Sequence, residues 1–197
     1  MKLHFFGMLT ALLLFASCND DSDKRAAENL RYQNKREAVF SSISKSWNFN
    51  SQPINPPSQQ LTTTWEQWRV FLNDLSEKPQ STIGAFRKKA KSLSQRIQEV
   101  QATIPIPYNK PEVKSRLAVL ATKINSLNLF ISLPDVPEQK VVTLISEINS
   151  ELTSVQLQMS EIVRKNAIPR EVGESDMIRM LDTSRAIPNK PKSVKFE

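Results

Sequence analysis

Apolar residues recur at alternating spacings of four and three along most of the chain, and this periodicity constrains the fold more than any other feature. The clearest run extends from Val141 to Ile162 and has Val or Ile at the first position of each heptad. Three further seams precede it, at residues 61–75, 86–104 and 113–131. Such spacing places apolar side chains on one face of an α-helix. The sequence therefore predicts an all-α protein whose helices pack through heptad-type seams.

Prolines separate these seams. All 12 prolines lie outside the interiors of the predicted helices, where each would cost about 3 kcal/mol. Residues 24–47 are expected to add a first helix, and residues 48–58, which contain three prolines, a loop. Asn109 and Asp135 precede prolines and are expected to cap the helices that follow. Short connections favour antiparallel neighbours, so residues 24–168 are predicted to form an up-down bundle of four or five helices.

The N-terminus has the features of a secretory signal peptide: Lys2 is basic, residues 5–15 are apolar, and residues 16–17 are small. Cys18, the single cysteine of the chain, follows directly. These residues resemble the lipobox of bacterial lipoproteins, and the resemblance implies cleavage before Cys18 and acylation of its sulfur and of the new amino terminus. The apolar run is shorter than the roughly 20 residues of a membrane-spanning helix. We therefore expect residues 1–17 to be a signal peptide and the mature protein to be anchored in the cell envelope by lipid.

Residues 18–23 form an acidic tether that carries Asp20, Asp21 and Asp23. The tract resembles the export signal of surface-displayed lipoproteins of Bacteroidota, which implies a place on the outer face of the outer membrane. A solvated linker is the alternative. Because six extended residues reach at most about 20 Å, the folded domain is expected to lie close to the lipid.

Composition narrows the classes of function. Cleavage would remove His4, the single histidine, and acylation would consume the single thiol. Catalysis by imidazole or thiol groups and zinc sites with nitrogen or sulfur ligands are therefore excluded. Of the three glycines only Gly84 and Gly173 follow the signal peptide, so the chain has no glycine-rich loop for phosphate. We expect neither a cofactor nor a metal.

Two groups of side chains are candidate binding sites. Five basic residues near the anchor could rest on lipid phosphates, with a solvated helix face as the alternative: Lys24, Arg25, Arg31, Lys35 and Arg36. Three tryptophans could form an open aromatic slot for sugar, lipid or peptide, or else plug the core: Trp47, Trp65 and Trp68. Another basic patch, at residues 87–96, lacks interleaved aromatic residues, so nucleic-acid binding is not expected.

These features favour a non-enzymatic, lipid-anchored helical bundle of the cell envelope that binds a protein partner or scaffolds an assembly. One alternative is an envelope enzyme that uses carboxylates alone, which would need two acids converging in a cleft. Another is a carrier of an apolar ligand, which would need a cavity between the helices. Residues 169–197 are expected to form a short helix, at residues 175–185, and a tail.

Overall fold

A computed structural model describes residues 19–80, 82–169 and 181 of the 197-residue chain. The expected signal peptide, Cys18 and the expected C-terminal helix and tail beyond residue 169 therefore lie outside the described residues, residue 181 excepted. Over the described ranges the secondary structure consists of six α-helices and one 3₁₀ helix, without a strand. The all-α prediction is confirmed.

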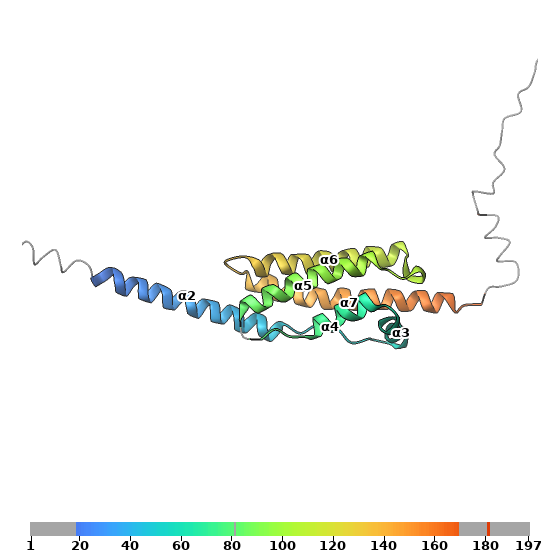
Figure 1. Cartoon of the computed structure of the whole chain (residues 1–197), viewed down its shortest axis with the longest axis horizontal. Helices are drawn as coiled ribbons and strands as arrows, with labels where there is room; N and C mark the ends of the chain where they lie inside the picture. The colour runs from blue at the N-terminus through green and yellow to red at the C-terminus, as the bar shows by residue number, and fades with distance from the viewer. Residues whose placement is uncertain (1–18, 81, 170–180, 182–197) are drawn as a thin grey trace, which may run out of the picture.

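The helices form an antiparallel bundle, as predicted. In Figure 1, α5, α6 and α7 run side by side in alternating directions. Helix α4 packs on α5, whereas α2 and α3 pack on α7. The elements in chain order are α2 (Asn19–Ser46), α3 (Pro56–Thr64), α4 (Glu66–Ser76), α5 (Ile83–Ala102), the 3₁₀ helix η2 (Ile106–Tyr108), α6 (Pro111–Ser132) and α7 (Glu138–Asn166).

The predicted heptad seams make up most of the core. Every apolar residue at a four-three position of the four seams is buried, except Ile104 and Ile162, which are partly buried against the same core. Burying one such side chain contributes about 1.5–3 kcal/mol by removing apolar surface from water. The four-three spacing thus identified the inward face of each helix correctly.

The seam predicted at residues 61–75 is divided between two helices, because the backbone is extended at Trp65 (φ −106°, ψ 97°). Three successive threonines precede it, and each donates its hydroxyl to the carbonyl four residues earlier. Threonine has a low helix propensity because it is β-branched, and a hydroxyl bonded to the carbonyl four residues earlier slightly destabilises the helix. The prediction of one continuous helix here is wrong, and the break accounts for the sixth helix.

The loop predicted at residues 48–58 ends earlier than expected, because α3 begins at Pro56. The side-chain oxygen of Asn55 accepts a hydrogen bond from the backbone N–H of Ser58 at 3.0 Å. Two prolines then occupy the first helical positions, where their missing N–H groups cost nothing. Asn55 therefore provides the cap and proline start that we had assigned only to later helices.

The two predicted caps of α6 and α7 do not form. Lys110 and Pro137 are the N-cap residues of these helices, and neither makes a side-chain capping bond. Asn109 instead ends the 3₁₀ helix η2. Asp135 lies two residues before the N-cap of α7, and its carboxylate accepts a hydrogen bond from Lys35. The carboxylate of Asp135 was expected to cap α7, but it binds Lys35 of α2 instead.

An extended strap, residues 47–55, connects α2 with α3 and is held along α7 by side-chain amides. Asn149 accepts from the backbone N–H of Asn50 at 2.7 Å and donates to the carbonyl of Asn48 at 2.9 Å. One heptad later, Gln156 bonds the strap in the same way: it accepts from the N–H of Ile54 at 3.1 Å and donates to the carbonyl of Gln52 at 3.4 Å.

The spacing of these amides matches the strap. Seven residues of helix rise about 10.5 Å, and four residues of extended chain span about 13 Å. An amide one heptad farther along α7 therefore meets the strap about four residues farther along. Asn149 bonds residues 48 and 50, and Gln156 bonds residues 52 and 54. This match explains why Gln156, a polar residue at 0% exposure, lies among apolar neighbours.

Replacing Gln156 by alanine should lower the free energy of unfolding by about 1–3 kcal/mol. The change leaves the backbone N–H of Ile54 and the carbonyl of Gln52 without their part-buried hydrogen bonds to the amide, and an unmade hydrogen bond away from bulk water costs about that much. Chemical denaturation of the variant measures the effect. Gln98→Ala is the matched control, because Gln98 is exposed on α5, and this substitution should change stability by less than about 0.5 kcal/mol. Equal effects of the two substitutions would show that the amide does not hold the strap.

Candidate functional site

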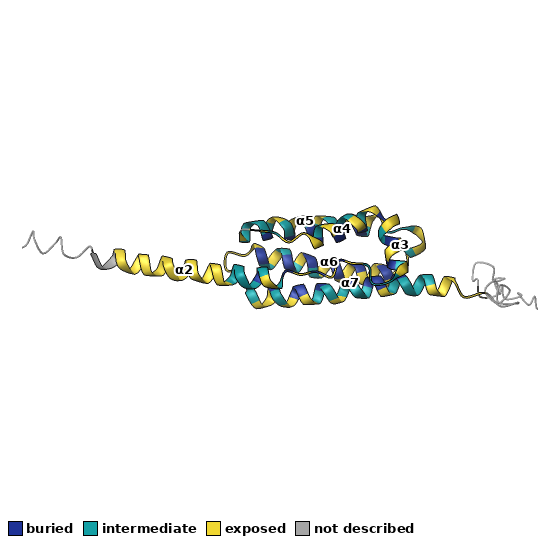
Figure 2. Ribbon diagram, turned by 90° about the horizontal axis from the view of Figure 1, so that it is seen from below, coloured by how far each residue is buried: buried dark blue, intermediate teal, exposed yellow. Residues whose placement is uncertain are grey.

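Helix α2 has two parts with different environments. Its residues 22–38 are exposed on every side, whereas from Val39 onward the helix packs on the bundle. Figure 2 shows the exposed part projecting beyond the other helices. We call residues 22–38 the arm. A helix of this length with no apolar face is typical of a segment that bridges solvent between two attachment points.

The five basic residues predicted as a contact surface all lie on the arm and are exposed. At 100° per residue they occupy one side of the helix. They form two rows, Lys24 with Arg31 and Lys35, and Arg25 with Arg36. The arm therefore has a basic side, in which Glu28 is the single acidic residue.

The basic side faces the same direction as the face of α2 that packs on the bundle. Lys35 Nζ donates to Asp135 Oδ1 in the loop between α6 and α7 at 2.8 Å. This hydrogen bond raises the pKa of Lys35, and the negative charge of Asp135 raises it by a smaller amount. Both side chains are largely exposed, at 61% and 82%, so the pair contributes little stability. It does show where the arm meets the bundle.

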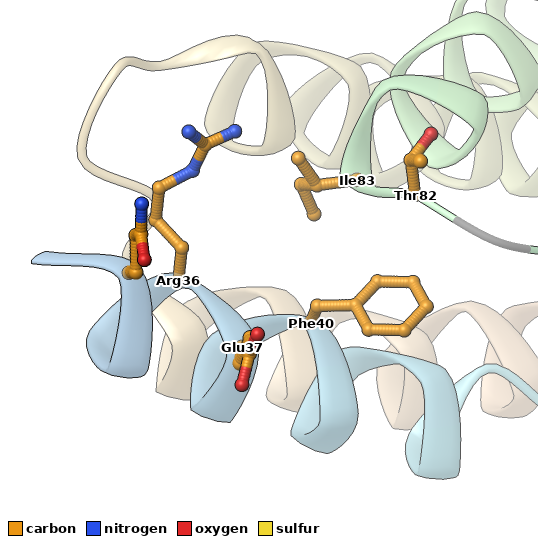
Figure 3. Close-up of a pocket in the computed structure, with 6 residues that line it drawn as sticks. Arg36, Glu37, Phe40, Thr82 and Ile83 are labelled. Atoms are coloured by element: carbon orange, nitrogen blue, oxygen red, sulfur yellow. The ribbon is translucent and has the colours of Figure 1, made fainter. Parts of the chain in front are cut away.

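A pocket of about 250 Å³ lies at this junction, between the arm and the start of α5. Figure 3 shows Phe40 and Ile83 on its apolar walls and Arg36 beside them, and Glu37 also lines the pocket. The guanidinium of Arg36 lies 5.6 Å from the centre of the Tyr32 ring, a cation–π distance. Among the described residues it makes neither a hydrogen bond nor an ion pair.

A smaller hollow adjoins this pocket on the side of the α6–α7 loop. Tyr32, Lys35 and Arg36 line it from α2, and residues 134–136 line it from the loop. Arg87, also at its edge, donates to the carbonyls of Ile131 and Leu133 at 2.9 and 2.8 Å. Arg87 thereby binds the carbonyl groups at the end of α6, where a cation is favourable. We call the concave surface formed by the two pockets and the adjoining basic side of the arm the corner.

The side chains of the corner suit binding better than catalysis. A guanidinium without an anionic partner can donate several hydrogen bonds, and the neighbouring apolar and aromatic groups offer contact area. Across the described residues, no group of three or more His, Cys, Asp or Glu side chains could hold a metal ion. No helix in that part of the chain is long and apolar enough to cross a membrane.

The three tryptophans do not form an open slot. Trp47, Trp65 and Trp68 are 3%, 2% and 0% exposed, so the core alternative is the correct interpretation. They also separate into two groups. Trp65 stacks on Trp68 with ring centres 5.8 Å apart, whereas Trp47 contacts the ring of Phe86 edge-on at 4.9 Å.

The acidic tract is described only in part. Cys18 lies outside the described residues, and so do the side chains of Asp20 and Asp21. Residues 19–23, which we had assigned to a tether, are part of helix α2. Asp23 is exposed there.

The corner was not predicted from the sequence. One signal was available, because Tyr32, Arg36, Val39 and Ile43 follow each other at spacings of four, three and four. Val39 and Ile43 pack on the bundle, and Tyr32 and Arg36 extend the same seam along the arm with polar side chains. The other half of the corner, the start of α5 and the α6–α7 loop, has no sequence pattern that would connect it to the arm.

Comparison of the sequence with protein-family models and with curated proteins, and of the fold with solved structures, finds no match.

Proposed function

We propose that this chain is a lipid-anchored, non-enzymatic protein of the cell envelope, whose bundle binds a partner protein or scaffolds an assembly. The observation that carries the proposal is the arm. Cys18, the residue with lipobox features before it, directly precedes a continuous helix that leads into the bundle. A helix between a lipid anchor and a folded bundle serves as a spacer.

The arm changes the expected distance from the lipid. Residues 19–38 are helical and span about 30 Å at 1.5 Å per residue. An upright arm would thus hold the bundle farther from an anchor at Cys18 than the roughly 20 Å that an extended tether allows. The expectation that the bundle lies against the lipid does not follow from this geometry. A partner could then reach the bundle from every side.

The acidic residues support a non-enzymatic role. Several are engaged in ion pairs between or within helices, among them Asp74 with Lys89 and Arg96, and Glu147 with Lys123. Catalysis by carboxylates would instead need two acids facing each other across a cleft. The apolar seams fill the space between the helices, which speaks against an apolar-ligand carrier.

For the location we propose the outer membrane, with the bundle on the cell surface. The proposal depends on the resemblance of the acidic tract to the export signal of surface-displayed lipoproteins. Of that tract, Asp23 has a described and exposed side chain, available to an export partner.

Acylation tests the anchor directly. Cells that express the chain are fed an alkyne fatty acid, which should label the wild type and leave Cys18→Ser unlabelled, since the acyl groups need the cysteine sulfur. Ser17→Ala is the matched control, because alanine keeps the residue before the cysteine small, and it should be labelled like the wild type. Equal labelling of the wild type and Cys18→Ser would refute the lipoprotein proposal.

A further inference from the structure

We propose that the corner binds an acidic helix of a partner protein, which lies alongside the arm and ends against the α6–α7 loop. The inference deepens the proposed function, since it names the surface and the chemistry of the partner. It does not require acylation, so its failure and that of the lipid anchor are distinguishable.

The arm offers a helix-binding register. Val39 and Ile43 pack on the bundle, and the same four-three spacing continues outward through Arg36, Tyr32, Asn29 and Arg25. Heptad-spaced residues on one helix form the seam on which a second helix packs. Along the arm this seam has no partner among the described residues. Nearer the bundle, α2 packs on α7. A partner helix could pack on the seam of the arm in the same way.

The chemistry of this seam selects an acidic partner. The arm has five basic and three acidic residues, and of the acidic ones Asp23 and Glu37 lie away from the basic side. Two arginines of the seam lie on either side of Tyr32, which is 56% exposed. Tyrosine and arginine are the residue types that most often dominate binding energy at protein interfaces. Glutamates at heptad spacing could pair with the guanidinium groups, while apolar residues cover the ring.

The shape of the corner favours a helix over a flat lipid surface. Lys35 and Arg36 face the bundle, next to residues 134–136 of the α6–α7 loop. A flat membrane that approached these two side chains would meet the loop and the start of α5 first. A helix about 10 Å in diameter can lie along the arm without this obstruction. The part of the basic surface nearest the bundle is therefore reached more easily by a narrow ligand.

The described end of the last helix lies far from the corner. Helix α7 ends at the opposite end of the bundle from the arm (Figure 1). Residues 170–197 hold six basic and five acidic residues, so this segment carries no net negative charge that the corner would attract. A separate acidic helix is therefore the better match in charge.

The test measures binding of a fluorescent 21-residue helical peptide, with glutamates and leucines together on one heptad-spaced face, to the full chain in a non-ionic detergent. We expect salt-sensitive binding, because charged contacts set both rate and specificity. The triple variant Arg25→Gln, Arg31→Gln, Arg36→Gln should bind about tenfold more weakly or worse, a loss of about 1.4 kcal/mol. The control variant Lys88→Gln, Lys91→Gln, Lys114→Gln removes the same charge from exposed positions on α5 and α6 and should bind like the wild type.

Four outcomes would overturn the proposal. The first is absence of peptide binding, and the second is equal weakening in both triple variants, which would indicate a response to net charge alone. The third is flotation of the Cys18→Ser chain with anionic phosphatidylglycerol vesicles that is lost in the arm variant, because a lipid surface would then be the occupant. The fourth is a dimer in sedimentation velocity that the arm substitutions dissociate, because a second copy would then fill the corner.

Discussion

Truncation of Ile148 or Leu152 to alanine is expected to lower the free energy of unfolding by about 2–5 kcal/mol, through lost apolar transfer and a residual cavity. Both side chains are 0% exposed. They lie in the middle of α7, which packs against α6, α2 and α3, so neighbours on several sides limit collapse into the void. Such a loss is a large part of the 5–15 kcal/mol that is typical of folded domains.

Ser150→Ala is the control for both truncations. Ser150 lies between the two residues on α7 but is exposed, so its replacement should change stability by less than about 0.5 kcal/mol. Thermal and chemical denaturation of the three variants makes the comparison. If Ile148→Ala and Leu152→Ala destabilise no more than Ser150→Ala, α7 does not lie in a core, and its seam would be an exposed surface for a partner helix.

The bundle could be predicted from the sequence because its information is local. A seam such as Val113 to Ile131 repeats every three or four residues, and this repeat alone specifies which side of the helix must leave water. Prolines marked the ends for an equally local reason, since each lacks an N–H and obstructs the preceding turn. The antiparallel direction of the helices followed from these two signals, and their number did so except for the break at Trp65.

The interruptions of the pattern could not be predicted. At Trp65 the heptad continues in the sequence while the backbone leaves the helix, because spacing reports which side is buried and not whether the helix is continuous. The strap was missed for another reason. It is held by Gln156 and Asn149, about a hundred residues away, and no local pattern connects an amide on one helix with backbone groups of a remote loop.

The basic residues of the candidate site were predicted from the sequence, but their place beside the α6–α7 loop was not. Its five basic residues follow from the sequence of α2, but their proximity to Asp135 depends on how α2 packs on the bundle. Lys35 and that aspartate are 100 positions apart. The tryptophans illustrate the reverse case, because their chemistry allowed a binding slot and only their burial identified them as core.

Replacing Phe86 by alanine should lower the free energy of unfolding by about 3–5 kcal/mol, the range for a buried phenylalanine. Phe86 is 0% exposed, and its ring meets two aromatic rings edge-on: that of Phe40 in α2 at 5.7 Å and that of Trp47 at 4.9 Å. Edge-on ring pairs add about 0.5–1.5 kcal/mol each to area burial. Phe86 is therefore a main contact that joins α5 to the end of α2 and the start of the strap.

The consequence of losing this ring should be local as well as global, since the arm is attached to the bundle beside it. Phe130→Ala is the matched control: Phe130 is partly buried, with Lys140 Nζ 5.2 Å from its ring centre, and its loss should cost about 1 kcal/mol, near the average for point substitutions. Denaturation measures stability, and limited proteolysis reports whether α2 detaches at residues 39–47. We expect Phe86→Ala to be cleaved there at denaturant concentrations at which Phe130→Ala stays intact. Identical stability and cleavage of the two variants would mean that other contacts hold α2, and that the corner is not braced by this aromatic cluster.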